Sequence, residues 1–291
     1  MIKDFLFFSY SWVKNANIIF KQFELNGYVC DFVDETNLHT FKPIHQYKNI
    51  VLYLHENNTI PITNYLIDTF YKYSNLIQHD DTDEEHVQVW SNKTPNLVIQ
   101  RELTQNSKNI HKCIVEPMHF AVESIYEDMD KKYDVSFVAT LTNNRRINFV
   151  NKILDLSKNE LKHLKWFIEV SPRDTRTPTK FKEIINSSKI GLHYYGNSYD
   201  SLRIWEMASC KTAILMPKMK TLSVQKEYME FTEYETFEED FSDLKDKILK
   251  LLNNDTYKIL ANNSYKAFNL RHNHVKCYDY YHGILKKHNL I

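Results

Sequence analysis

The chain has 291 residues, of which 43% are hydrophobic, and it carries 37 basic and 37 acidic side chains. This length is too great for one small domain and suits two domains of ordinary size. A formal net charge of zero argues against a strong non-specific nucleic-acid binder, which is usually basic overall.

The first half of the chain has short apolar runs that alternate with stretches of helical spacing. We expect helices where apolar residues recur every three or four positions, as at Ile19 and Phe23, and strands where they run continuously. The predicted strands are residues 4–9, 28–33, 49–54, 75–78, 96–100 and 112–115, and the predicted helices are 15–26 and 62–73.

A charged stretch without apolar periodicity, residues 123–132, predicts a domain boundary, after which the alternation restarts. The predicted strands of the second half are 134–141, 164–170, 189–194 and 212–216, and its predicted helices are 145–156, 179–187, 202–209, 241–252, 255–267 and 274–287. We therefore expect domains at 1–128 and 129–271, with 272–291 as a closing helix that packs back on the first domain.

Strands that alternate with helices predict parallel sheets covered on both faces. The expected fold class is α/β, with two Rossmann-like, doubly wound domains facing a central cleft. Ligands of such sheets lie outside the carboxyl ends of the strands, so we expect the site in that cleft. Only four glycines are present, which excludes a glycine-rich phosphate loop. Any phosphate must then meet other backbone amides or Arg and Lys side chains.

The segment 201–206, Ser-Leu-Arg-Ile-Trp-Glu, follows a polar turn and precedes the apolar strand 213–216. Together with 133–140, the arginines at 145 and 146, and 185–194, it resembles the carboxyl-terminal domain of GT-B glycosyltransferases. The resemblance is strongest to the CgeB-like group, which shares a "glycosyl transferases group 1" domain. It covers roughly residues 132–281, about half of the chain, and the order and spacing of its pieces carry it.

The resemblance implies that Glu206 accepts hydrogen bonds from the ribose of a nucleotide-sugar donor. Arg203 is three positions away on the same helix face, where it would pair with a donor phosphate or orient Glu206. The structural alternatives are that Glu206 caps its own helix and that Arg203 forms an ordinary ion pair.

Two loops complete the expected donor site. In the loop 141–146, backbone amides and one arginine, Arg146 in preference to Arg145, would hold the diphosphate; alternatively both arginines face solvent. The turn 193–198 lies at the end of a predicted strand, although a single histidine there is more often structural. The expected donor-binding residues are Thr142, Arg145, Arg146, His193, Tyr195, Ser198, Ser201, Arg203 and Glu206.

The first half contains the acidic cluster 78–86, for which three interpretations compete. It is a solvated helix start, or it supplies a general base through His79 or Asp80, or Asp81 and Asp83 bind a divalent metal as in GT-A enzymes. We favour them in that order and expect no metal. In the loop 9–12, Tyr10 and Trp12 would stack on a sugar or base in the cleft, or else are buried aromatics.

These features predict a glycosyltransferase that moves a hexose or pentose from a nucleotide-diphosphate sugar, UDP-linked, to a hydroxyl acceptor. The acceptor is a polysaccharide, a protein, a small molecule or the hydroxymethylated DNA of a phage, and no cofactor beyond the co-substrate is expected. One alternative is a TIR-like signalling or NAD-cleaving protein, because residues 7–12 weakly resemble the opening of TIR domains. The other is a non-catalytic scaffold that binds nucleotide sugars.

The four cysteines form no Cys-x-x-Cys pair, which favours reduced thiols and a cytoplasmic location in a bacterium or in the host of a phage. No apolar run approaches the ~20 residues that span a bilayer, so no membrane span is expected.

Overall fold

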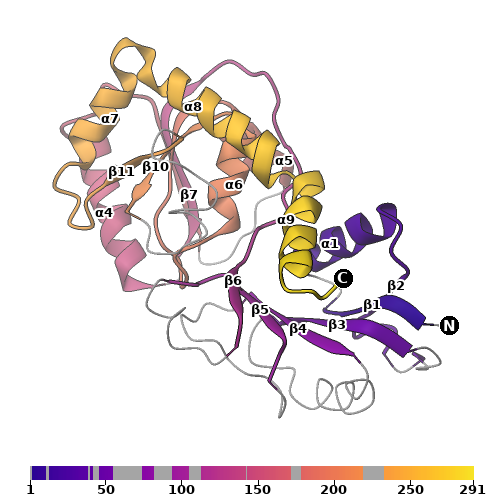
Figure 1. The fold of residues 1–291 in the computed structure, drawn as a ribbon. Coiled ribbons are helices and arrows are strands. Elements are labelled where there is room, and N and C mark those ends of the chain that lie inside the picture. Colours follow the sequence, from indigo (N-terminus) through magenta and orange to yellow (C-terminus); the bar gives the residue numbers. More distant parts are fainter. Residues whose placement is uncertain are drawn as a thin grey trace. The chain divides into compact units, whose positions relative to one another are not determined.

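The computed structural model describes residues 2–10, 13–38, 40–41, 46–54, 74–81, 94–104, 113–141, 143–171, 178–218 and 233–291. These residues form two compact units. Unit 1 consists of the described parts of Met1–Ala121 and of His274–Ile291, and unit 2 consists of those of Val122–Lys220 and Val224–Asn273. Each unit is built on its own parallel sheet with its own helices (Figure 1).

Unit 1 has a six-stranded sheet in the order β2-β1-β3-β4-β5-β6, with every neighbouring pair parallel. Its strands are β1 (Ile2–Phe8), β2 (Cys30–Val33), β3 (Gln46–Leu54), β4 (Asn75–Asp80), β5 (Leu97–Gln100) and β6 (Val115–Pro117). Helix α1 (Lys14–Leu25) buries Ala16, Ile19 and Phe23, which recur at helical spacing. The chain then turns at Gly27, whose φ of +89° is a conformation that favours glycine.

The last helix, α9 (His274–Lys287), belongs to unit 1 and packs beside α1, with the rings of Phe23 and Tyr278 5.2 Å apart. Its Tyr281 hydroxyl donates a hydrogen bond to the backbone carbonyl of His119 and lies 3.0 Å from Nε2 of His79. The buried His79 ring stacks on Tyr53, with centroids 4.0 Å apart. These hydrogen bonds tie α9 to β4 and to the segment after β6, and His79 in turn packs on β3.

Unit 2 has a five-stranded parallel sheet in the order β11-β10-β9-β7-β8. Its strands are β7 (Tyr133–Thr140), β8 (Trp166–Ser171), β9 (Ser188–Leu192), β10 (Ala213–Pro217) and β11 (Glu235–Phe237). Its helices are α4 (Asn144–Lys158), α5 (Pro178–Asn186), α6 (Leu202–Ser209), α7 (Leu244–Leu252) and α8 (Thr256–Ala267), with a 3-10 turn at Asn253–Asp255 and a π-helical turn at Phe268–His272.

A glycine on β9 sets how closely α6 approaches the sheet. A Cβ at Gly191 would lie 2.5 Å from Sδ of Met207, a separation that real Cβ atoms do not show. Gly191 therefore leaves room for the Met207 side chain of α6 against β9.

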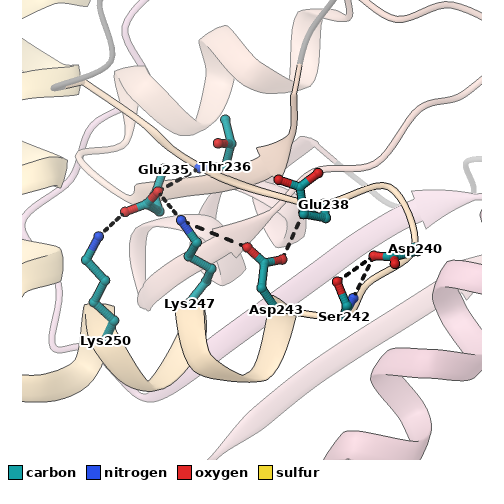
Figure 2. Close-up of polar contacts among 8 residues, drawn as sticks. All are labelled: Glu235, Thr236, Glu238, Asp240, Ser242, Asp243, Lys247 and Lys250. Carbon is teal, nitrogen blue, oxygen red and sulfur yellow. Dashed lines mark hydrogen bonds and ion pairs between the residues drawn. The ribbon is translucent and has the colours of Figure 1, made fainter.

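The short strand β11 depends on partners that are distant in sequence. Among the described strands it pairs with β10 alone. Its Glu235 carboxylate lies 2.9 Å from Nζ of Lys247 and 2.6 Å from Nζ of Lys250, both on α7 (Figure 2). These two lysines lower the pKa of Glu235, against the effect of burial. At the start of α7, Asp243 accepts a hydrogen bond from the backbone N–H of Glu238.

The chain enters unit 2 at Val122 and leaves it at Asn273, and these two residues pair in an isolated parallel β-bridge. Among the helices of the described residues, none is both long enough and apolar enough to cross a membrane.

Candidate functional site

A cavity of about 340 Å³ opens at the carboxyl end of the unit 2 sheet, where open α/β sheets usually bind their ligands. Four segments form its wall: the end of β7, the first turn of α4, the end of β9 with the residues after it, and the amino-terminal part of α6. The lining residues are Phe137, Val138, Ala139, Thr140, Arg146, Leu192, His193, Tyr194, Ser201, Leu202, Arg203 and Glu206. Five of the nine expected donor-binding residues therefore share one cavity.

The amino-terminal half of α6 carries an ion pair whose two residues line this cavity. Nη1 of Arg203 lies 3.1 Å from Oε2 of Glu206, and the two side chains are 24% and 22% exposed, so a ligand can reach both. Cζ of Arg203 lies 3.7 Å from the ring centre of Phe181 on α5. The ring holds the guanidinium by a cation–π contact, while the backbone of α6 fixes the spacing to Glu206.

Arg146 is committed largely to the protein's own backbone. Its guanidinium donates hydrogen bonds to the carbonyls of Thr140 at 2.6 Å, Tyr194 at 2.9 Å and Tyr195 at 3.0 Å. Burial, and then the charge of Arg203, lower its pKa to about 10. Three of its five N–H groups thus fasten the end of β7 to the segment after β9. This bracing role is what the structure gives Arg146, and its expected diphosphate contact stays a prediction.

Two further residues complete this brace; the sequence reasoning placed both in the expected donor-site loops but gave neither a role of its own. The Asn143 side chain caps α4 by accepting a hydrogen bond from the backbone N–H of Arg146 at 2.9 Å, and it donates one to the carbonyl of Gly196. Gly196 also makes room, because a Cβ there would lie 2.9 Å from Nη2 of Arg146. The preference for Asn before a helix could have revealed the cap by Asn143, whereas nothing local could have revealed that Gly196 lies against Arg146.

His193 is a buried, neutral part of the cavity wall. It is 3% exposed, and its pKa is lowered to about 3, chiefly by burial and then by the charges of Arg146 and Arg203. Its Nε2 atom has no hydrogen-bond partner among the described residues, and the same holds for Oγ of Ser201.

Of the four other expected donor residues, the three that the structure describes do not line the cavity. Arg145 is exposed and hydrogen-bonded to Tyr199, which raises its pKa. The Tyr195 hydroxyl donates to the carbonyl of Lys218 at 2.8 Å, and that of Ser198 donates to the carbonyl of Asp200 at 3.0 Å. Thr142 lies outside the described residues, as do Trp12 and Asp83.

In unit 1, the expected bases His79 and Asp80 stand at the carboxyl end of β4 and are 2% and 0% exposed. Burial lowers the pKa of His79 to about 3, and its ring contacts Tyr53 and Tyr281 as described above. A general base must reach the proton that it removes. The structure thus gives His79 a packing role, and catalysis by His79 or Asp80 stays a prediction.

The neighbouring Asp81 is paired with Arg101, at 2.8 Å between Oδ1 and Nη1, and both side chains are buried. Within the described part of the chain, no group of three or more His, Cys, Asp or Glu side chains is arranged to hold a metal ion. Tyr10 is partly buried, which raises the pKa of its hydroxyl; stacking of its ring on a sugar stays a prediction.

No protein-family model and no curated protein matches this sequence. Solved structures match it in fold. HepE of Anabaena, solved with UDP-glucose, has a TM-score of 0.61 at 10% identity and covers 98% of this chain and 100% of its own. Sucrose-phosphate synthase of Thermosynechococcus elongatus has a TM-score of 0.62 at 8% identity and covers 98% of each chain.

TarM of S. aureus has a TM-score of 0.56 at 13% identity and covers 81% of this chain. The present chain spans about half of TarM, 54% of its length, and 57% of the chain that it matches in the GtfA/B complex.

These neighbours are GT-B glycosyltransferases, and the chain has the GT-B fold, with its two α/β units on sheets of six and five parallel strands. The predicted α/β fold class is therefore confirmed. The finer resemblance to the CgeB-like group stays a prediction.

Proposed function

We propose that the chain is a glycosyltransferase that moves a sugar from a UDP-linked donor to a hydroxyl acceptor. One observation carries the proposal: Arg203, Glu206, His193 and Ser201 line a single cavity at the carboxyl end of the second sheet of a GT-B fold. The neighbour HepE was solved with UDP, with UDP and glucose, and with UDP-glucose, which supports a uridine nucleotide.

In this proposal, each side chain of the ion pair meets one part of the donor. The Glu206 carboxylate has only acceptor oxygens and suits the adjacent hydroxyls of a ribose. The Arg203 guanidinium matches the geometry of phosphate oxygens. Sugar transfer leaves negative charge on the departing diphosphate, so a cation that is already in position stabilises the transition state. The brace formed by Arg146, Asn143 and Gly196 holds the cavity wall in place.

The proposal also covers the charge at the diphosphate, the acceptor and the location of the reaction. The positive charge at the diphosphate comes from Arg203 without a metal ion. The acceptor is a glycan, a protein, a small molecule or hydroxymethylated DNA. The reaction takes place in the cytoplasm, in keeping with the four free cysteines. The TIR-like alternative gains no support, because it leaves the whole of unit 2 unexplained.

A thermal-shift screen over UDP, GDP, ADP and their sugars tests the proposal. A ligand at about 100 times its Kd adds about 2.7 kcal/mol of stability, and for a domain of this size that raises the Tm by about 5–10 °C. We expect this rise with UDP-sugars, and we expect Glu206→Ala to abolish it.

Glu183→Ala, which changes an exposed glutamate on α5, is the matched control and keeps the rise. An unchanged rise in Glu206→Ala would refute the ribose assignment. Binding without release of UDP across a panel of acceptors would favour the scaffold alternative.

A further inference from the structure

His193 follows directly after β9, lines the cavity and has one buried ring nitrogen without a hydrogen-bond partner among the described residues. The side chain is 3% exposed, lines the cavity and has no hydrogen-bond partner at Nε2 among the described residues. Ser201, at the N-cap of α6, lines the same cavity and makes no capping bond with its side chain. A buried polar atom without a partner is rare in proteins and costs free energy, so a ligand group is the natural partner here.

The hydrogen-bond network assigns the proton of the imidazole. The ring makes a hydrogen bond to the backbone of Tyr199, which favours the protonated ring, so the ring donates in that bond. Because Nε2 is the nitrogen without a partner, the donating nitrogen is Nδ1. A neutral imidazole has one donor and one acceptor, so Nε2 carries a lone pair. The positive charges of Arg146 and Arg203 further disfavour a second proton.

This lone pair limits which ligand group can face His193. A phosphate oxygen offers only lone pairs at neutral pH and cannot satisfy Nε2. A donor such as a hydroxyl satisfies it by giving its hydrogen to the bond. In a nucleotide sugar, such hydroxyls occur on the transferred sugar and on the ribose.

We propose that His193 is a specificity-determining residue that accepts a hydrogen bond from one hydroxyl of the bound nucleotide sugar. The inference rests on the proposed function and adds to it. Arg203 and Glu206 explain how the diphosphate and ribose are held. His193 adds the requirement that a hydroxyl of the bound ligand donates its hydrogen to Nε2 of this residue.

Calorimetry with UDP-glucose and a set of its analogues tests this inference. The analogues lack one hydroxyl each, either at positions 2, 3, 4 or 6 of the glucose or at the 2′ or 3′ position of the ribose, so they distinguish the two sources of the hydroxyl. We expect wild type to bind one analogue at least about 10-fold more weakly than UDP-glucose. The fluorinated analogue at that position should bind as weakly, because fluorine has no hydrogen to donate.

His193→Phe removes the lone pair and keeps a planar ring, and we expect it to bind the decisive analogue and UDP-glucose equally. His193→Gln places an amide oxygen in reach of the same point and should keep part of the discrimination. As a measurement on wild type, the ¹⁵N resonance of Nε2 should shift from that of a free lone pair to that of a hydrogen-bonded one when UDP-glucose is added.

Two results would overturn the inference alone. In one, wild type binds UDP-glucose and every analogue equally; in the other, His193→Phe discriminates among them as wild type does. The absence of any binding of UDP or UDP-glucose to wild type would instead overturn the proposed function, and the inference with it.

Discussion

The guanidinium carbon of Arg203 lies 3.7 Å from the centre of the Phe181 ring, so a residue of α5 supports the charged residue at the start of α6. Phe181 is 8% exposed and does not line the cavity, so it acts through Arg203. The contact keeps the guanidinium near Glu206, where the proposed diphosphate would meet it.

Replacing Phe181 with Leu should weaken UDP binding. A cation–π contact contributes about 0.5–2 kcal/mol, which corresponds to a loss of about 2- to 30-fold in affinity. Calorimetric titration with UDP measures the loss. Phe181→Tyr keeps the aromatic face and should bind nearly as wild type does. Wild-type affinity in Phe181→Leu would show that the ring does not position Arg203.

Gly196→Ala should destabilise unit 2, because its Cβ would lie 2.9 Å from Nη2 of Arg146 and three backbone carbonyls hold that guanidinium in place. The expected loss is about 1–3 kcal/mol, measured by urea unfolding and accompanied by weaker UDP binding.

The matched control is Gly283→Ala on α9. Gly283 is exposed, and a Cβ there meets nothing within 4 Å. Alanine should stabilise this helix by about 1 kcal/mol. If Gly196→Ala has the same urea midpoint of unfolding as wild type, the close approach of Arg146 to residue 196 does not contribute to the stability of unit 2.

Stability should fall as the pH is lowered from 6.5 towards 3, because burial lowers the pKa of His79 and of His193 from 6.5 to about 3. In that window the unfolded chain binds protons at these rings and the folded chain does not, so acid favours unfolding. Each ring contributes up to about 1.4 kcal/mol per pH unit. Urea unfolding at about pH 7 and about pH 5 measures the slope.

His79→Gln should reduce the change of unfolding free energy with pH by the contribution of one buried histidine. His163→Gln, which changes an exposed histidine, should leave that change as it is in wild type. A stability that is constant across the window, or a wild-type slope in His79→Gln, would contradict the assignment. NMR titration of the His79 ring, which should stay neutral below pH 5, is a second measurement should that variant not fold.

Much of the fold could be predicted because its signals are local. The apolar spacing and the polar turn before Leu202 place a helix at 202–209, and α6 spans Leu202–Ser209. Strand β11 was missed because Glu-Thr-Phe has no apolar run, and Lys247 and Lys250 stabilise it from another element. The strand predicted at 112–115 was wrong in its bounds. β6 extends through Glu116, whose carboxylate is paired with the distant Lys287 and His288.

In the candidate site too, local sequence signals could be predicted and contacts between distant residues could not. Sequence reasoning could group His193, Ser201 and Arg203 because the carboxyl ends of parallel strands meet at one edge of the sheet. It could not show that Arg146 bonds to backbone carbonyls, since those acceptors follow from tertiary packing. His79 looked like a base at a strand end, but its environment comes from Tyr281, 202 positions later in the chain.

The return of α9 to unit 1 has a consequence for synthesis on the ribosome. Helix α9 packs in unit 1, but the ribosome makes it only after all of unit 2. Unit 1 therefore gains its last helix after unit 2 has been made, although most of unit 1 is made first. A nascent chain arrested before His274 would leave β4 and α1 without their cover of Tyr281 and Tyr278. Such a chain exposes apolar surface until α9 is made, and we expect chaperones to bind it during that time.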